Sequence, residues 1–359
     1  MARKNLGKVK RYHRSFYSGG QRLRRILTGV LGLAVLFAAG WLVGPAVIDF
    51  GTSTWYSLKA GGGNSGATST PQSAPAAEAS PAPAATPAPT PAPAMEPGEG
   101  GWAFVSISSL SSAEQAAATA QDLAAEGGSY AVVPCKDSQG YIYYQSSVAA
   151  AQTNISATTF DAAAVGALKE AGITPVASIC AFRDPQAPYV DRTMAVRYQD
   201  TEYFWLDAAA DAGGKPWLNP YSQGAANYIT ALIDEARAMG FEQIWLTGVQ
   251  FPTIAGRDKA NFGDTGGLSM GQRLAQLLEG WQAGGDCWVE YPLAEVAAGA
   301  DSQVLGASCA DLGVKNLAIR VEGDLNEEQQ MQLDAAVADA KAGGVANVAL
   351  VQGDSFTLL

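Results

Sequence analysis

The stretch AANYITALIDEARAMGFEQIWLTGVQFP, residues 225–252, decides the fold that we expect for this chain. Its first part carries apolar side chains at helical spacing from Ile229 to Ala236, and Gly240 marks the expected end of the helix. The apolar run 243–249 follows at once and is typical of a strand buried on both faces. A helix that leads through a short turn into such a strand is the repeating unit of a parallel sheet covered by helices.

Apolar runs and helical segments alternate in the same way from Trp102 to the C-terminus. We expect eight strands, at 102–108, 130–135, 173–182, 243–249, 287–291, 303–308, 316–321 and 347–351. The helical patterns between them cover 111–128, 159–172, 225–240, 269–285 and 326–344. This alternation over residues 102–359 predicts an α/β fold, a (β/α)8 TIM barrel, with a doubly wound open sheet as the alternative.

The amino terminus differs in charge from the rest of the chain. Residues 1–25 hold nine of the 23 Lys and Arg residues and none of the 34 Asp and Glu residues, which leaves 14 basic and 34 acidic residues in the remainder. Residues 26–48 carry no charge and are long enough to cross a bilayer as a helix. We favour this anchor over a cleaved signal peptide, because the basic region and the apolar run are both longer than a signal sequence needs.

The basic residues predict the orientation of this single-pass protein in the cell membrane. Positive charge collects on the cytoplasmic side, so residues 1–25 are expected to form a cytoplasmic tail. Everything after Asp49 is then extracellular, and we do not expect the tail to bind nucleic acid. Residues 49–101 are rich in Gly and Ser and then in Pro and Ala, a composition that predicts a disordered linker. Residues 102–359 remain as the outer barrel domain.

The distribution of histidine excludes several kinds of chemistry. The one histidine of the chain is His13, in the predicted tail. The outer domain therefore cannot use a Ser-His-Asp or Cys-His arrangement, nor a zinc ion held by histidine. It also shows no loop signature for a metal held by oxygen atoms, so we expect no metal and no cofactor.

Polar segments follow the predicted strands, at the end where a barrel builds its site. Residues 135–146 read CKDSQGYIYYQS, residues 181–188 read AFRDPQAP, residues 216–222 read PWLNPYS, and residues 249–252 read VQFP. In this order the segments resemble a bacterial family of glycoside-hydrolase-like barrels of the amylase type, whose members are often anchored in the membrane. The resemblance extends over most of residues 102–322. It implies a domain that acts on or binds polysaccharide or oligosaccharide of the cell surface or cell wall.

The resemblance also assigns expected site residues. Those expected to bind the substrate are Lys136, Arg183, Tyr144, Trp217, Tyr221, Thr247 and Gln250. On the fourth strand, however, the Asp, Tyr and Arg of the family fall on Thr247, Gly248 and Gln250. In amylase-like barrels that Asp is the nucleophile, and glycoside hydrolysis normally needs two carboxyl groups. We therefore expect a weakly active or inactive hydrolase.

Three carboxylates remain as catalytic candidates. Glu290 lies near the end of the fifth strand, and Asp137 and Asp184 follow the second and third strands. A new pair of Glu290 with Asp184 could support hydrolysis. The alternative is that Asp137 and Asp184 form ion pairs with Lys136 and Arg183, and that Glu290 pairs with an Arg. In that case a non-catalytic carbohydrate-binding or envelope scaffolding module, or a protein-interaction domain on a barrel support, remains open.

The cysteines leave two possibilities open. The chain has four, Cys135, Cys180, Cys287 and Cys309, all in the predicted outer domain. Neighbouring strands favour disulfides between Cys135 and Cys180 and between Cys287 and Cys309. The alternative is four buried free thiols, because a domain of this size does not need covalent crosslinks.

Overall fold

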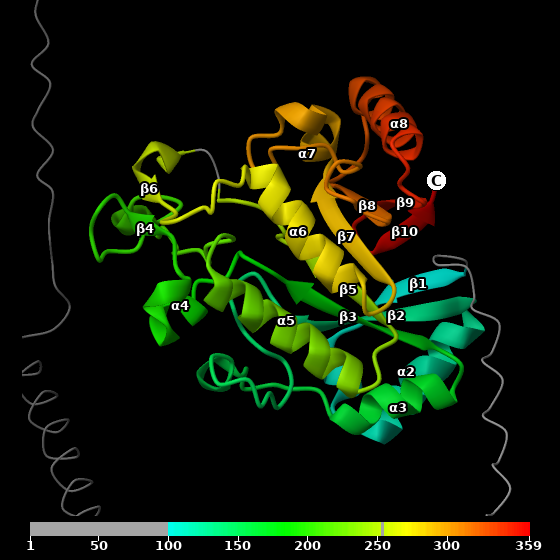
Figure 1. Cartoon of the computed structure of the whole chain (residues 1–359). Coiled ribbons are helices and arrows are strands. Elements are labelled where there is room, and N and C mark those ends of the chain that lie inside the picture. The colour runs from blue at the N-terminus through cyan, green and yellow to red at the C-terminus, as the bar shows by residue number, and fades with distance from the viewer. Residues whose placement is uncertain (1–99, 253–254) are drawn as a thin grey trace, which may run out of the picture. The chain divides into compact units, whose positions relative to one another are not determined.

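The structure, a computed structural model, describes residues 100–252 and 255–359, which all belong to one compact unit, Pro89–Leu359 (Figure 1). The expected cytoplasmic tail, transmembrane helix and nearly all of the expected linker lie outside the described residues. Within the described ranges, no helix combines the length and the apolar character needed to cross a bilayer.

Eight strands form the main sheet of the described chain. They are β1 (Gly101–Phe104), β2 (Gly128–Lys136), β3 (Thr174–Cys180), β5 (Gln243–Thr247), β7 (Cys287–Pro292), β8 (Asn316–Val321), β9 (Asn347–Gln352) and β10 (Ser355–Leu358). Their order in the sheet is β1-β2-β3-β5-β7-β8-β9-β10. All neighbouring pairs from β1 to β9 are parallel, and β10 is antiparallel to β9.

Helices cover the outside of the sheet (Figure 1). The α-helices are α2 (Ala113–Ala125), α3 (Ala162–Glu170), α4 (Ala187–Val190), α5 (Gln223–Ala238), α6 (Met270–Gln282), α7 (Leu293–Ala298) and α8 (Glu327–Ala342). Side-chain caps start the longer ones: Ser222 accepts a hydrogen bond from the backbone of Ala225, and Ser269 forms a capping box with Gln272. The apolar face of α5 from Ile229 to Ala236 is buried, as its spacing predicts.

The sheet is a nearly closed barrel filled by aromatic rings. One cluster of packed side chains draws on all eight strands: Trp102 of β1, Tyr130 and Val132 of β2, Val176 of β3, Trp245 of β5, Trp288 of β7, Ala318 of β8, Ala349 and Val351 of β9, and Phe356 of β10. Trp102 and Phe356 stack with their ring centroids 4.4 Å apart, so the first and last strands lie side by side. An open sheet could not bring its two edges together in this way, and the open-sheet alternative is therefore wrong.

The expected set of strands needs two corrections. The run 303–308 is not a strand but a series of turns, although its residues Val304 and Leu305 are buried. The eighth strand is β10, which the sequence did not predict because most of its side chains are exposed. It follows β9 through a two-residue turn in which Gly353 has a φ of +59°, a conformation that suits glycine. The barrel thus has seven parallel strands and one antiparallel strand.

A long connection after β3 covers one end of the barrel. We call residues 181–222, between β3 and α5, the β3–α5 excursion. Its own small core contains Val196, Trp205 and Trp217. A two-stranded sheet of β4 (Arg197–Tyr198) and β6 (Ala260–Asn261) joins the excursion to the loop after β5. The excursion therefore stands beside the carboxyl ends of the barrel strands, where it can form a wall of a site.

Candidate functional site

A cavity of about 340 Å³ lies at the carboxyl ends of four neighbouring strands, β2, β3, β5 and β7. We call it the mouth cavity. Its lining residues are Ser138, Cys180, Arg183, Asp207, Trp217, Thr247, Gly248, Gln250, Glu290 and Pro292. Larger cavities of about 390, 480 and 720 Å³ also lie on the described chain, but none of the three is lined by the ends of barrel strands. The mouth cavity is therefore the candidate site.

The alternation of side chains along the strands aims residues into this cavity. Trp245 and Trp288 fill the barrel interior, and the residue two places after each of them is Thr247 and Glu290, respectively. Both of these later residues line the mouth cavity. The aromatic filling of the barrel thus forms the floor beneath the candidate site.

The end of β5 presents no carboxylate to the cavity. Thr247 and Gln250 line it, and Gly248 between them has a φ of +61°. A Cβ atom at Gly248 would stand 2.9 Å from the Sγ atom of Cys180, so a side chain cannot enter without displacement. The carbonyl groups of Thr247 and Gly248 accept hydrogen bonds of 2.8 and 3.1 Å from the backbone of Ala181 and Phe182. The positive φ and the close approach of Cys180 account for glycine at position 248, where the family that the sequence resembles has Tyr.

Glu290 is held by an arginine and a tryptophan. Its Oε1 atom accepts a hydrogen bond of 2.6 Å from Nε of Arg320, and its Oε2 atom accepts bonds of 2.8 Å from Nη2 of Arg320 and 3.0 Å from Nε1 of Trp245. The hydrogen bond to Glu290 is the main reason why the pKa of Arg320 is raised. This bidentate arrangement fixes the orientation of the Glu290 carboxylate. This is the Arg-paired alternative of the sequence interpretation.

Asp207 is a second carboxylate of the mouth cavity, and the sequence interpretation missed it. It belongs to the β3–α5 excursion, where its Oδ1 atom accepts a hydrogen bond of 2.7 Å from the backbone of Lys215. Its Oδ2 atom accepts a bond of 3.0 Å from Nε1 of Trp217. The sequence search followed strand ends, and Asp207 is far from any strand end in sequence. Its place at the end of the segment WLD, residues 205–207, was the available signal.

Asp184 and Lys136 form a buried ion pair and do not line the mouth cavity. The Nζ atom of Lys136 lies 3.1 Å from Oδ2 of Asp184, and both side chains are fully buried. Backbone amides of Gln186 and Ala187 donate to Oδ1 of Asp184 at 2.8 and 2.9 Å. Gly140 packs so closely on this carboxylate that a Cβ atom there would lie 2.3 Å from Oδ1. The ion pair thus joins β2 to the start of the β3–α5 excursion, in place of the expected pairs within each segment.

Three other expected site residues also point elsewhere. Asp137 closes the turn after β2, because its carboxylate accepts hydrogen bonds from the backbone of Gln139 and Tyr141 and from the hydroxyl of Tyr143. Burial, followed by the hydrogen bond to Asp137, raises the pKa of Tyr143 to about 12.

The two expected tyrosines also bind elsewhere. The hydroxyl of Tyr144 donates to Glu235, and that of Tyr221 donates to the carbonyl of Leu268, each at 3.0 Å. None of these side chains is among those that line the mouth cavity.

All four cysteines are free and buried, so the expected disulfides are absent from the structure. Cys135 packs in the core between strands and helices, whereas Cys180 faces the mouth cavity. Their side chains therefore occupy different environments although β2 and β3 are neighbours. Cys287 and Cys309 both lie in the core between strands and helices, where burial raises the pKa of each thiol to about 12. Such thiols are protonated at neutral pH and unsuited to act as nucleophiles.

Among the described residues, no group of three or more His, Cys, Asp or Glu side chains is placed so that it could hold a metal ion.

The first part of the barrel matches a known family. A model described as "Putative glycosyl hydrolase domain" matches residues 103–279, which run from β1 to α6 and stop before Glu290. No curated protein matches the sequence. The matched region therefore contains the altered end of β5, while the Glu290–Arg320 pair lies beyond it.

Several solved structures are similar to the chain. A hypothetical protein from Ruminiclostridium thermocellum is 19% identical, with 52% of this chain and 96% of that chain covered and a TM-score of 0.45. A family 20 exo-β-N-acetylglucosaminidase from Vibrio harveyi, in complex with N-acetylglucosamine, is 13% identical. The match covers 70% of this chain and 41% of that chain, with a TM-score of 0.47. The glycoside hydrolase domain of PelA from Pseudomonas aeruginosa is 13% identical. The match covers 69% of this chain and 81% of that chain, with a TM-score of 0.36.

Proposed function

We propose that this protein binds polysaccharide in the mouth cavity of a glycoside-hydrolase-like barrel, and that hydrolysis there is weak or absent. The observation that carries the proposal is the state of Glu290, whose two carboxylate oxygens accept three hydrogen bonds from Arg320 and Trp245. A general acid must be free to reach the oxygen of the leaving group, whereas both carboxylate oxygens of Glu290 are already held by donors of the fold. At the same cavity, β5 offers a hydroxyl and Gln250 an amide in place of a nucleophile.

The lining of the mouth cavity suits sugar hydroxyl groups. Asp207 and Glu290 accept hydrogen bonds, and Thr247 and Gln250 can both donate and accept them. Arg183 adds an exposed guanidinium group that can bind hydroxyl or acidic groups of a glycan. The cavity volume of about 340 Å³ lies within the range of small-molecule sites, about 300–1,000 Å³. These features support binding of a short stretch of sugar residues.

The location that we propose rests on the amino-terminal sequence. Residues 26–48 would anchor the protein in the cell membrane, with residues 1–25 in the cytoplasm and residues 49–101 as an extended spacer. The barrel would then be extracellular and reach cell-surface or cell-wall polysaccharide. This arrangement suits a binding or scaffolding role, because an anchored binding module can hold the envelope close to the membrane.

Weak glycoside hydrolysis is the second candidate function, because Asp207 and Glu290 line the same cavity. In retaining and inverting enzymes, two carboxyl groups stand about 5 to 10 Å apart across the sugar bond. In such a reaction Asp207 would act as nucleophile or base and Glu290 as acid. Asp184 cannot replace Asp207 in this pair, because it is fully buried against Lys136.

The test uses the full chain in detergent, incubated with purified cell-wall glycans and α-glucans. We expect retention on the glycan without release of reducing ends. Arg183→Ala should weaken retention about ten-fold, because a charged hydrogen-bond donor is lost. Met331→Ala is the control, since Met331 is exposed on α8 and does not line the mouth cavity. Release of reducing ends that Glu290→Gln abolishes would reject the binding proposal and establish hydrolysis.

A further inference from the structure

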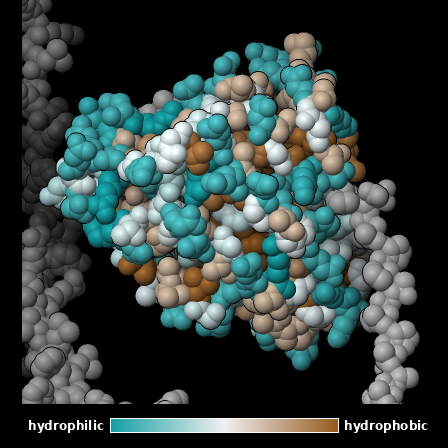
Figure 2. Space-filling model, viewed as in Figure 1, coloured by the Kyte–Doolittle hydropathy of each residue, from teal (hydrophilic) through white to brown (hydrophobic). Residues whose placement is uncertain are grey.

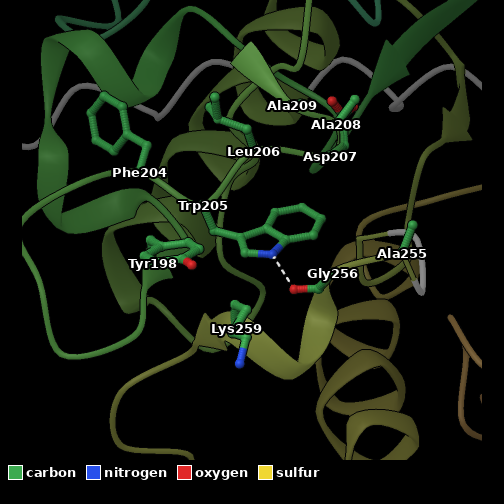
Figure 3. A pocket seen from close by; sticks show the side chains of 10 residues that line it. All are labelled: Tyr198, Phe204, Trp205, Leu206, Asp207, Ala208, Ala209, Ala255, Gly256 and Lys259. Carbon is green, nitrogen blue, oxygen red and sulfur yellow. Dashed lines mark hydrogen bonds between the residues drawn. The ribbon is translucent and has the colours of Figure 1, made fainter. Parts of the chain in front are cut away.

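A second cavity, of about 390 Å³, shares one lining residue with the mouth cavity, and Figure 3 shows its lining. We call it the outer cavity. Its walls come from β4, from residues 204–209 of the β3–α5 excursion, and from the loop after β5, which contributes Gly256 and Lys259. The shared residue is Asp207, which lines both cavities. A ligand long enough to pass Asp207 could therefore occupy both.

The outer cavity has an aromatic wall and few polar groups. Tyr198 is 40% exposed and Phe204 is partly exposed, whereas Trp205 of the same wall is only 1% exposed (Figure 3). The polar side-chain groups include the hydroxyl of Tyr198, the carboxylate of Asp207 and the amino group of Lys259, which lies 3.3 Å from Asp258. Flat rings with a few polar groups suit a sugar residue, which has apolar faces and hydroxyl edges.

Contacts within the β3–α5 excursion hold this wall in place. Nε1 of Trp205 donates a hydrogen bond of 2.8 Å to the carbonyl of Gly256, which fixes the indole ring against the loop after β5 (Figure 3). The ring of Phe204 contacts Tyr189 at 5.1 Å and the guanidinium of Arg192 at 4.2 Å, measured to its centroid. A wall fixed in advance loses little entropy when a ligand binds, which favours affinity.

Further aromatic rings lie on the surface next to the outer cavity. Tyr203 is 75% exposed and Tyr189 is 65% exposed, and both neighbour Phe204 in the chain or in space. Figure 2 shows one face of the described chain, on which hydrophobic residues are scattered among hydrophilic ones. Exposed aromatic side chains therefore continue from the outer cavity onto the surface.

We infer that one linear glycan chain occupies the mouth cavity and the outer cavity together and passes over Asp207. The site then recognises a stretch of several sugar residues within a polysaccharide, not a single sugar. This inference rests on the proposed function of the mouth cavity. The glycan is favoured over a peptide because hydroxyl-binding groups stand beside the partly exposed rings of Tyr198 and Phe204, and because β4, the strand in the outer cavity's lining, is only two residues long and too short to pair with a peptide backbone.

The test measures affinity against ligand length. Calorimetry on the full chain in detergent would use chito-oligosaccharides and malto-oligosaccharides of one to seven residues. We expect affinity for one of the series to rise with length and to level off once both cavities are filled. Tyr198→Ala should lower the affinity for the longest members about ten-fold and leave that for the shortest within two-fold. Lys259→Ala is a second variant, because the Lys259 side chain is 47% exposed and lines the outer cavity, and it should also lower the affinity for the longest members.

Tyr141→Ala is the matched control, because Tyr141 is 44% exposed and lines neither cavity. It should leave the length dependence unchanged. An affinity that does not change with length, while Arg183→Ala still weakens binding, would overturn the inference and leave the proposed function intact. Binding of neither series by the folded protein would overturn both. Binding of an unstructured peptide that Tyr198→Ala abolishes, with no effect of sugar length, would also overturn the inference.

Discussion

At the scale of single residues, the mouth of the barrel is defined by how charges are paired. Asp184 is neutralised by Lys136 inside the fold, and Glu290 is neutralised by Arg320 at its edge. The first pair is fully buried, so removing one partner would leave a charge in the interior. The second pair is partly exposed and faces the cavity, where a ligand can reach it. An ion pair therefore stabilises the fold at Asp184, and a second one shapes the candidate site at Glu290.

Gly248 is the residue whose replacement should deform the mouth cavity most directly. Gly248→Ala should cost about 1–3 kcal/mol of stability, because the added Cβ meets Cys180 in a backbone conformation that alanine avoids. Urea unfolding followed by tryptophan fluorescence would measure the loss. Glycan retention should fall as well, since both residues line the cavity.

Gly266→Ala is the matched control for this substitution. Gly266 has the same φ of +61°, and nothing lies within 4 Å of an added Cβ. The difference between the two variants isolates the contact with Cys180, and Cys180→Ala should restore part of the stability of Gly248→Ala. Equal losses for the two glycine variants would show that the contact does not matter.

At the scale of elements, α5 holds the long segment that follows β2. Glu235 of α5 accepts hydrogen bonds from the hydroxyls of Tyr144 and Ser146 and from the backbone of Ser147. Burial alone would raise the pKa of this carboxyl, but the hydrogen bonds from Ser146, Ser147 and Tyr144 outweigh it, and the pKa is lowered. These bonds fix residues 144–147 of the segment against α5.

This arrangement predicts how stability depends on pH. The folded pKa of Glu235 lies below its usual value of 4.5, so the unfolded chain binds the proton more readily. The stabilisation is present above about pH 4.5 and is lost as the pH falls through the folded pKa. Glu235→Gln should therefore lower stability at neutral pH and flatten its decline on acidification, measured by urea unfolding over a pH series.

Glu242→Gln serves as the comparison. Glu242 is 52% exposed and pairs with Lys169 at the surface, where an ion pair contributes little. Its replacement should leave both the neutral stability and the acid slope nearly unchanged. If the stability of Glu235→Gln declined on acidification as steeply as that of the unaltered protein, the pH dependence could not be assigned to Glu235.

At the scale of the whole molecule, the barrel depends on contact between its first and last strands. Trp102 stacks on Phe356 and on Tyr130, and its ring also contacts Trp245 and Trp288. β10 thus supplies the side chain that completes the ring of strands. Without it, the interior tryptophans of β1 and β7 would face solvent at the open edge.

Phe356→Ala should consequently loosen the barrel as a whole. We expect a loss of about 2–4 kcal/mol, because a packed aromatic ring leaves a cavity next to Trp102 and Trp288. Thermal unfolding and a shift of tryptophan fluorescence would report it. Tyr203→Ala removes an aromatic ring that is 75% exposed and should change stability by less than about 0.5 kcal/mol. A loss no greater than that of Tyr203→Ala would mean that β10 does not close the sheet.

The candidate site was only partly predictable. Arg183, Thr247, Gln250 and Glu290 line the mouth cavity and lie at or just after strand ends, which apolar runs locate, whereas Trp217 was expected there from the family resemblance alone. Lys136, Asp137, Asp184, Tyr144 and Tyr221 make contacts elsewhere in the fold. Asp207 enters the cavity from an excursion whose path has no repeating pattern. Motif position shows which strand end a residue follows but not which partner its side chain finds.

The sequence by itself determined the alternation of helices and parallel strands and the lack of a carboxylate at the end of β5. These features are local, because the spacing of apolar residues decides which face of a helix or strand is buried. Only the tertiary structure decided that residues 303–308 form turns and that β10 closes the barrel in their place. It also decided that Lys136 pairs with Asp184 and that Asp207 lines two cavities. Each of these depends on segments far apart in the chain, whose approach is fixed by packing in three dimensions.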